Sequence, residues 1–281
     1  MHSHPRLFCD ETPVRVLDPG RGRTKICQFW AHAIDDRPWN GPAPPAVAYV
    51  FAGSRGKKEI VTQLAGFEGV LQVDGYAGYR KLAEKGDVQL AFCWTHVRRR
   101  FYELAVGGTM PIAAQAVERI AALYAIEKDI RGRCADERRA VRQSRSRPLL
   151  LELEPWLRQQ LALISQKSKL AEAIRYALSR WEGLTRFVDD GRIEIDSNVV
   201  ERAIRPIALN RKNALFAGSD GGAENWAIVA SLIETCKLNG VDPQAWMAET
   251  LTKIVSGHLN SEIDDLLPWA YASPQPLKHV A

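Results

Sequence analysis

Residues 1–108 contain two kinds of hydrophobic pattern. In some segments apolar residues alternate with polar ones or form short runs, and in others they recur at the period of a helix. Runs rich in β-branched and aromatic residues, bounded by turn residues, predict strands. These strands are expected at residues 6–17, 24–34, 46–51, 70–73 and 88–94. Apolar residues at helical spacing predict helices at 57–67, 79–84 and 97–105. The turn Gly20-Arg21-Gly22-Arg23 makes the first two strands a hairpin.

The order of these elements predicts the fold class. A strand meander followed by strands that alternate with helices gives a mixed sheet with helices on its faces, in the α/β class. Ribonuclease-H-like domains have this order of elements. We therefore expect a ribonuclease-H-like mixed sheet flanked by helices, with an all-helical insertion and a helical C-terminal region.

Strand signals end after residue 108. Residues 113–130 and 155–181 have a helical period, and the arginine-rich residues 131–147 between them are expected to be a solvated connector, with DNA contact as the lesser alternative. The division that follows has a first core part, a helical insertion, a second core part with the candidate catalytic glutamate, and a C-terminal helix with a tail. These parts are residues 1–108, 109–190, 191–240 and 241–281.

Composition and charge leave a broad range of functions. The 281 residues are 46% hydrophobic and 25% charged, as in ordinary globular proteins, and the formal net charge of +5 is compatible with a polyanionic partner. The five cysteines contain no C-x-x-C pair, which predicts reduced, mostly buried thiols and disfavours a structural zinc site. No signal peptide and no apolar run of roughly 20 residues is evident, so we expect a cytoplasmic protein without a membrane partner.

Three carboxylates stand in settings that suit a shared metal site. Asp10 lies inside the first strand, Asp74 ends the fourth, and Glu201 lies near the start of a helix. Mg²⁺ is usually held by a few carboxylates together with substrate phosphates. Each acid also has a simpler interpretation: a solvent-facing strand residue for Asp10, the first residue of an Asp-Gly turn for Asp74, and an i,i+4 ion pair with Arg205 for Glu201.

Other acids near Glu201 compete for its role. Asp196, Ser197 and Asn198 are all good helix N-caps, and capping is the preferred interpretation for Asp196. Glu194 and Asp18 remain possible substitutes for Glu201 as the third acid.

Basic residues surround these acids in the sequence and are candidates for phosphate contacts. They are Arg98, Arg99, Arg202, Arg205, Arg211 and Lys212. The alternative for any one of them is a solvated helix face. His96 is interpreted first as a hydrogen-bonded structural histidine and second as a neighbour of the metal ligands or of a phosphate.

Two enzyme classes find little support. Residues 218–222 are glycine-rich, but they lack the lysine of a phosphate-binding loop and do not follow a strand. A serine hydrolase is disfavoured because no Gly-x-Ser-x-Gly turn occurs.

A series of motifs resembles the insertion sequence 66 family of bacterial transposases. The motifs are residues 10–14, 71–76, 92–99, 195–206, 211–213 and 216–219. The resemblance runs from about residue 8 to 272. It implies a DDE catalytic domain on a ribonuclease-H-like fold, with Asp10, Asp74 and Glu201 as catalytic residues that bind Mg²⁺ or Mn²⁺, two ions in all. It also implies metal-dependent cleavage and transfer of DNA strands, with transposon ends and target DNA, a second copy of the chain and accessory proteins as partners.

The sequence departs from the family pattern in two places. Full-length members carry an N-terminal region with a cysteine-based zinc motif, whereas this chain begins at Met1, shortly before Asp10, so a truncated copy, a split reading frame or a fragment is expected. Ser197 stands where the family often has asparagine. Two alternatives to an active transposase follow: a non-catalytic remnant that binds DNA or a full-length relative, and a ribonuclease-H-like nuclease that acts on another nucleic acid.

Overall fold

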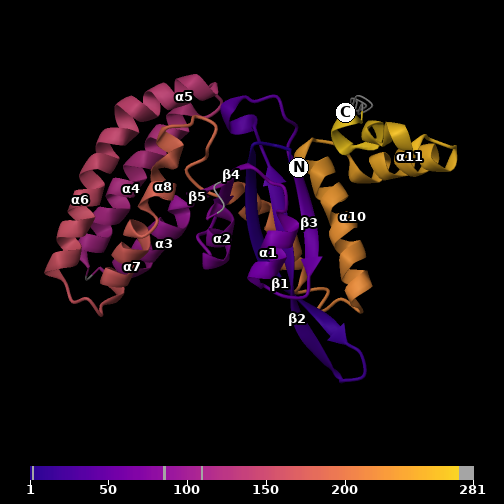
Figure 1. Cartoon of the computed structure of the whole chain (residues 1–281), viewed down its shortest axis with the longest axis horizontal. Coiled ribbons are helices and arrows are strands. Elements are labelled where there is room, and N and C mark those ends of the chain that lie inside the picture. Colours follow the sequence, from indigo (N-terminus) through magenta and orange to yellow (C-terminus); the bar gives the residue numbers. More distant parts are fainter. Residues whose placement is uncertain (2, 85–86, 109, 272–281) are drawn as a thin grey trace, which may run out of the picture. The chain divides into compact units, whose positions relative to one another are not determined.

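A mixed five-stranded sheet organises the computed structural model, which describes residues 1, 3–84, 87–108 and 110–271 (Figure 1). Its strands are β1 (Arg6–Asp18), β2 (Arg23–Ile34), β3 (Ala46–Ala52), β4 (Gly69–Val73) and β5 (Val88–Phe92). Their order in the sheet is β3-β2-β1-β4-β5. β2 and β3 are antiparallel, whereas β4 is parallel to both β1 and β5. The predicted mixed α/β sheet is therefore confirmed, with strand limits within two residues of those expected.

Contacts between residues divide the chain into two compact units, which are described separately. The first comprises residues 1–10, 36–42 and 56–202, and the second comprises residues 11–35, 43–55 and those from 203 on. β1 and the helix α9 (Asn198–Asn210) contribute residues to both units.

In the first unit, the parallel strands fix where polar side chains can gather. Parallel neighbours need crossover connections, and α1 (Lys57–Gln63) precedes β4 while α2 (Arg80–Ala83) joins β4 to β5. Leu71, Gln72 and Val73 of β4 are all buried, as expected for a strand covered on both faces. The carboxyl ends of the parallel neighbours β4 and β5 lie at one edge of the sheet, beside the middle of the longer strand β1. Ligands bind at such an edge in open α/β sheets.

A helical layer follows β5 in the same unit. Its helices are α3 (Trp94–Ala105), α4 (Pro111–Ile130), α5 (Ala135–Val141), α6 (Arg147–Leu163), α7 (Lys169–Leu178) and α8 (Trp181–Thr185). Buried apolar residues from α3, α4, α6 and α7, such as Phe101, Ile120, Leu153 and Ile174, form one core with Ala91 of β5. This shared core fixes the helical layer to the end of the sheet where β5 passes into α3.

The helix predicted over residues 155–181 is instead two helices. α6 begins earlier, at Arg147, and continues through Pro155 to Leu163. A new helix then begins after Ser168, whose hydroxyl accepts a hydrogen bond of 3.1 Å from the backbone N–H of Ala171. Ser168 therefore marks the start of α7, because its side chain satisfies a backbone N–H group that the first turn of a helix leaves without a partner.

The prediction that residues 131–147 are a solvated connector is wrong. They form α5 and a π-helical stretch, Arg142–Ser146, that leads into α6. The side chains of Arg138 and Arg142 are 1% and 0% exposed. Arg142 donates hydrogen bonds of 2.8 and 2.6 Å to Glu127, and Arg138 donates to both Glu127 and Glu194. Burial is tolerated because carboxylates from distant parts of the chain neutralise both guanidinium groups.

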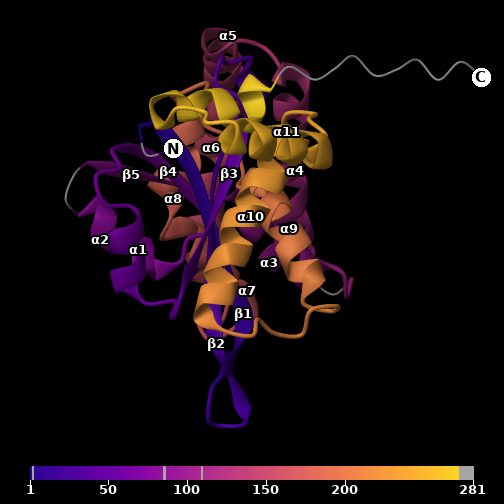
Figure 2. The ribbon, with the colours of Figure 1, turned by 90° about the vertical axis from the view of Figure 1, so that its right-hand side faces the viewer.

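The second unit contains the antiparallel strands and the C-terminal helices. α10 (Asp220–Leu238) packs on β3 (Figure 2). The hydroxyls of Ser231 and Thr235 accept hydrogen bonds from the backbone N–H groups of Tyr49 and Val47. α11 (Pro243–Val255) follows, and Trp246 packs with Cys236 in a small core of its own. The glycine-rich residues 218–222 are partly helical, since α10 begins at Asp220 after its N-cap Ser219.

The expected C-terminal tail lies partly outside the described residues, including Pro274 and Pro276. Within the part of the chain that is described, no helix combines the length and the apolar character needed to cross a membrane.

Candidate catalytic site

Asp10 and Asp74 stand at matching positions on neighbouring strands. The parallel register of β1 and β4 pairs Arg6 with Val70 and Phe8 with Gln72. Continued by two residues, the same register pairs Asp10 with Asp74. Neighbouring strands lie about 4.8 Å apart, so this continued register would place Asp10, within β1, beside Asp74, directly after the end of β4.

The turn after β4 holds Asp74 in place through its backbone and its side chain. Asp74 Oδ1 accepts a hydrogen bond of 2.7 Å from the N–H of Tyr76, so the interpretation as a turn-initiating residue is correct and is compatible with a further role. The carbonyl oxygen of Asp74 accepts a hydrogen bond of 2.8 Å from the hydroxyl of Tyr176. Gly75 has a φ of +98°, in the left-handed region that favours glycine, and a Cβ there would lie 2.6 Å from Nε of Arg180.

Glu201 lies beside the end of β5, the next strand along. The register of β4 and β5 pairs Val73 with Phe92, and one further step pairs Asp74 with Cys93. The ligand atoms of Cys93, His96 and Glu201 all lie within 4.8 Å of one another. Among the described residues this is the one such group of three, so the three predicted acids do not themselves converge to that distance. Asp10 lies within β1, Asp74 directly follows β4, and Glu201 lies beside Cys93, the residue that follows β5.

Glu201 and His96 face each other with unsatisfied atoms. Oε1 of Glu201 lies 3.7 Å from Nδ1 of His96, and both atoms are buried without a hydrogen-bond partner. The first interpretation of His96, a hydrogen-bonded structural histidine, therefore does not describe this nitrogen, and the second, a neighbour of the site, is favoured. A buried carboxylate oxygen without a partner is costly, and a bound cation would satisfy it. Cys93, by contrast, is held as a thiol, because burial raises its pKa to about 11.

The competing acids have other partners. Asp196 Oδ1 accepts a hydrogen bond of 3.1 Å from the N–H of Asn198, the first residue of α9, as the capping interpretation predicts. Burial raises the pKa of Asp196 above its usual range. Glu194 receives hydrogen bonds from Arg131 and Arg138, and Asp18 pairs with two arginines of the β1–β2 turn. These contacts leave Glu201 as the acid whose surroundings best suit a metal.

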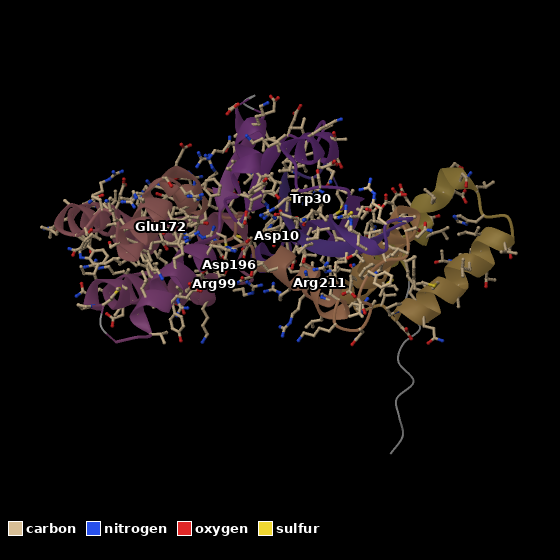
Figure 3. All side chains as sticks on the ribbon, turned by 90° about the horizontal axis from the view of Figure 1, so that it is seen from below. Asp10, Trp30, Arg99, Glu172, Asp196 and Arg211 are labelled. Carbon is tan, nitrogen blue, oxygen red and sulfur yellow. The ribbon has the colours of Figure 1, made fainter. Side chains whose placement is uncertain are left out.

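The basic residues predicted to bind DNA differ in their exposure to solvent. In the first unit, Arg99 (Figure 3) and Arg202 are exposed. The half-buried Arg98 lies over the ring of Tyr102, with Cζ 5.6 Å from the ring centre. In the second unit, Arg205 and Lys212 are exposed. The arrangement keeps Arg99 and Arg202, together with the exposed pair in the second unit, accessible to a large ligand.

Arg211, in the second unit, uses part of its guanidinium group to bind backbone carbonyls of that unit. Its Nη1 donates a hydrogen bond of 3.0 Å to the carbonyl of Pro13, and its Nε donates one of 3.2 Å to the carbonyl of Ala208 (Figure 3). It can therefore offer a phosphate only the donors that remain.

Three residues at this end of the first unit were not anticipated. Cys93 escaped notice because only C-x-x-C spacings were considered, although Cys93 and His96 form a Cys-x-x-His pair where β5 passes into α3. Four of the five cysteines are buried, as predicted. Tyr176 and Arg180 had no local signal at all, because Tyr176 is separated from Asp74 by 102 positions in the sequence.

Comparisons with known proteins identify the family of this chain. Residues 1–225 match the family described as Transposase IS66 family, and residues 231–269 match the IS66 C-terminal element. The uncharacterized proteins y4jD and y4qI of Sinorhizobium fredii (strain NBRC 101917 / NGR234) are each 48% identical to this chain, over 98% and 95% of its length and 55% and 51% of their own. A third protein of that strain, the uncharacterized protein y4hP, is 38% identical over 95% of this chain and 50% of its own length. The chain thus spans about half the length of these curated relatives. On the evidence of the family match over most of its length, the chain belongs to the IS66 family of transposases.

Proposed function

We propose that this chain carries the catalytic domain of a DDE-type DNA transposase that cleaves and joins the strands of a bacterial insertion sequence. The observation that carries the proposal is the parallel register of β1 and β4, which when continued brings Asp10 opposite Asp74, with Glu201 beside the end of the next strand. The strand order β3-β2-β1-β4-β5 supports a ribonuclease-H-like topology. Residues 109–190 are then the helical insertion that precedes the glutamate.

Asp10, Asp74 and Glu201 are the residues that would hold divalent cations, two ions of Mg²⁺ or Mn²⁺. Their hard oxygen donors suit these cations, and the buried, unpartnered Oε1 of Glu201 supports the assignment. When bound, such ions lower the pKa of an attacking water and neutralise the charge that develops on the phosphate.

The remaining groups of the site position the reactants. Arg98, Arg99 and Arg202 offer guanidinium groups to phosphate oxygens, and Arg205, Arg211 and Lys212 contact the DNA backbone further along. His96 keeps the carboxylate of Glu201 oriented from 3.7 Å. The thiol of Cys93 takes no part as a nucleophile, because its raised pKa of about 11 keeps it protonated at neutral pH.

Two successive displacements at phosphorus make up the reaction. In the first, the oxygen of a water molecule bonds to phosphorus at the transposon end, the bond from phosphorus to the 3′ oxygen breaks, and a 3′-hydroxyl is left. In the second, the oxygen of that hydroxyl bonds to a phosphorus of the target strand, the bond from that phosphorus to its 3′ oxygen breaks, and a 3′-hydroxyl is left on the target. Joining two ends to one target favours a second copy of the chain as a partner.

Strand cleavage of labelled DNA tests the proposal. Duplexes that carry the ends of the insertion sequence are incubated with the chain and Mg²⁺ or Mn²⁺, and an RNA–DNA hybrid is offered in parallel. We expect metal-dependent nicking by the wild type and by Glu224→Gln, a change at an exposed acid of α10, and none by Glu201→Gln. Circular dichroism shows whether the variants are folded.

Three other outcomes would contradict the proposal. Cleavage retained by Glu201→Gln removes that residue from the site. Binding of DNA without any product favours the non-catalytic alternative, and preference for the hybrid favours a nuclease.

A further inference from the structure

Two arginines enclose a tyrosine beside the turn that follows β4. Cζ of Arg100, on α3, lies 4.0 Å from the centre of the Tyr176 ring, and Cζ of Arg180, which follows α7, lies 3.9 Å from it. All three residues belong to the first unit. Arg100, Tyr176 and Arg180 are called the Arg–Tyr–Arg cluster below.

The cluster is attached directly to the catalytic strand end. The Tyr176 hydroxyl donates its hydrogen bond to the carbonyl of Asp74, and Nη2 of Arg180 donates one of 3.1 Å to the carbonyl of Gly75. A side chain at Gly75 would collide with Arg180. The two positive charges are therefore held next to the residue that is proposed to bind metal.

Little in the surrounding protein neutralises these charges. The hydrogen bonds of Arg180 go to neutral acceptors, the carbonyls of Gly75 and Tyr176 and the hydroxyl of Ser179, and its Nε is buried without a partner. Arg100 has a carboxylate partner in Glu172 at 3.6 Å, but that pair is exposed and therefore weak. Burial and the neighbouring charges of Arg80 and Arg100 lower the pKa of Arg180, whereas Asp74 opposes the shift. The arrangement favours an additional anion.

We propose that the Arg–Tyr–Arg cluster binds a phosphate of the DNA strand that lies in the active site. Guanidinium groups bind phosphate oxygens in a bidentate manner, and stacking on an aromatic ring fixes the plane of each group in advance. The inference rests on the proposed function and adds to it, because α7 lies in the helical insertion. The insertion then contacts the substrate strand beside Asp74.

The salt dependence of DNA binding tests the inference without any need for cleavage. Fluorescence anisotropy in EDTA measures the affinity of the whole chain for a labelled duplex at several salt concentrations. The plot of log affinity against log salt has a slope of about −0.9 for each neutralised phosphate. We expect Arg100→Gln and Arg180→Gln each to weaken binding several-fold and to make the slope shallower by up to about 0.9.

Three further variants separate a phosphate contact from a structural effect. Arg175→Gln is the matched control. Arg175 is an exposed arginine of α7, the helix that carries Tyr176, and it is bonded to Gln166. The change should leave affinity and slope unchanged. Arg180→Lys keeps the charge and should keep the slope while losing part of the affinity. Tyr176→Phe keeps the ring and should bind DNA with the wild-type slope.

Each outcome bears on a different claim. If both glutamine variants bind DNA with the affinity and slope of the wild type, the cluster is structural and the inference is overturned, while the proposed function stands. If the wild type itself binds no DNA, the proposed function fails as well. A Tm for Arg100→Gln close to that of the wild type shows that the loss of binding does not come from unfolding.

Discussion

Two pairs of arginines in the first unit carry the same charge in opposite surroundings. Arg138 and Arg142, in the helical insertion, are fully buried and bonded to the carboxylates of Glu127 and Glu194. Arg100 and Arg180 stack on an aromatic ring, and the hydrogen bonds of Arg180 go to neutral oxygens. Buried carboxylates neutralise the first pair, whereas the carboxylate bonded to the second pair is the exposed Glu172, 3.6 Å from Arg100.

The comparison separates charges that stabilise the fold from charges that await a ligand. A buried ion pair whose partners are all present resists substitution because removing one partner strands the other. A charge that the fold holds without a full counter-charge costs stability and is retained for binding or catalysis. The acids divide in the same way, since Glu127 and Glu194 are bonded to arginines, whereas Oε1 of Glu201 has no hydrogen-bond partner.

Asp74→Asn should have the largest effect, and it should act on the reaction alone. Asparagine keeps the oxygen that accepts the hydrogen bond from Tyr76, so the turn is preserved, but it removes the charge that would bind metal. A loss of several kcal/mol of metal stabilisation corresponds to a rate reduced by about a thousand-fold or more. Single-turnover cleavage measures the rate, and Tm measures stability. A large fall in Tm with normal cleavage would reverse the comparison.

Glu127→Gln should show the opposite pattern, a loss of stability. It leaves Arg142 and Arg138 buried without one of their counter-charges, which costs about 3–5 kcal/mol and lowers Tm by on the order of 10 °C. The control is Glu154→Gln, because Glu154 forms an exposed i,i+4 pair with Arg158 that contributes about 0.5 kcal/mol or less. Urea denaturation measures the free energy of unfolding of both variants and of the wild type. Equal effects of the two changes would show that burial does not distinguish these ion pairs.

Asp36→Asn should have a smaller effect that depends on pH. Burial alone would raise the pKa of Asp36, but its contacts with His4 and Arg6 hold that pKa below the ordinary 3.8. The carboxylate therefore stabilises the folded state above pH 3.8, and this contribution is lost as the pH falls through the lowered value. We expect the variant to lose about 1.5–3 kcal/mol at neutral pH and to approach the wild type in acid. Unfolding free energies measured from pH 7 downwards check this, and a constant difference would exclude Asp36 as the titrating group.

Much of the secondary structure was predictable because it depends on local periodicity. The strands β1 to β5 and the helices α4 and α11 lie close to their predicted limits, since a period of two or 3.6 reports which side of an element is covered. Residues 131–147 were not predictable in this way. Their arginines look like a solvated surface until Glu127 and Glu194 are brought beside them.

The sequence predicted the acids of the candidate site, but it did not predict which residues surround them. Asp10, Asp74 and Glu201 stand in motifs that identify the family, and their roles remain a prediction. His96 and Glu201 lie close together because α3 packs near α9. No local sequence pattern predicts this contact.

The sequence by itself determined the order of strands and helices in residues 1–108, the family and the candidate acids, because each of these depends on short stretches of neighbouring residues. The tertiary structure alone decided which charges are neutralised. Arg142 meets Glu127 across 15 positions, and Tyr176 meets Asp74 across 102. Electrostatic interactions depend on distance and burial in space, and neither is visible in a linear pattern of residues.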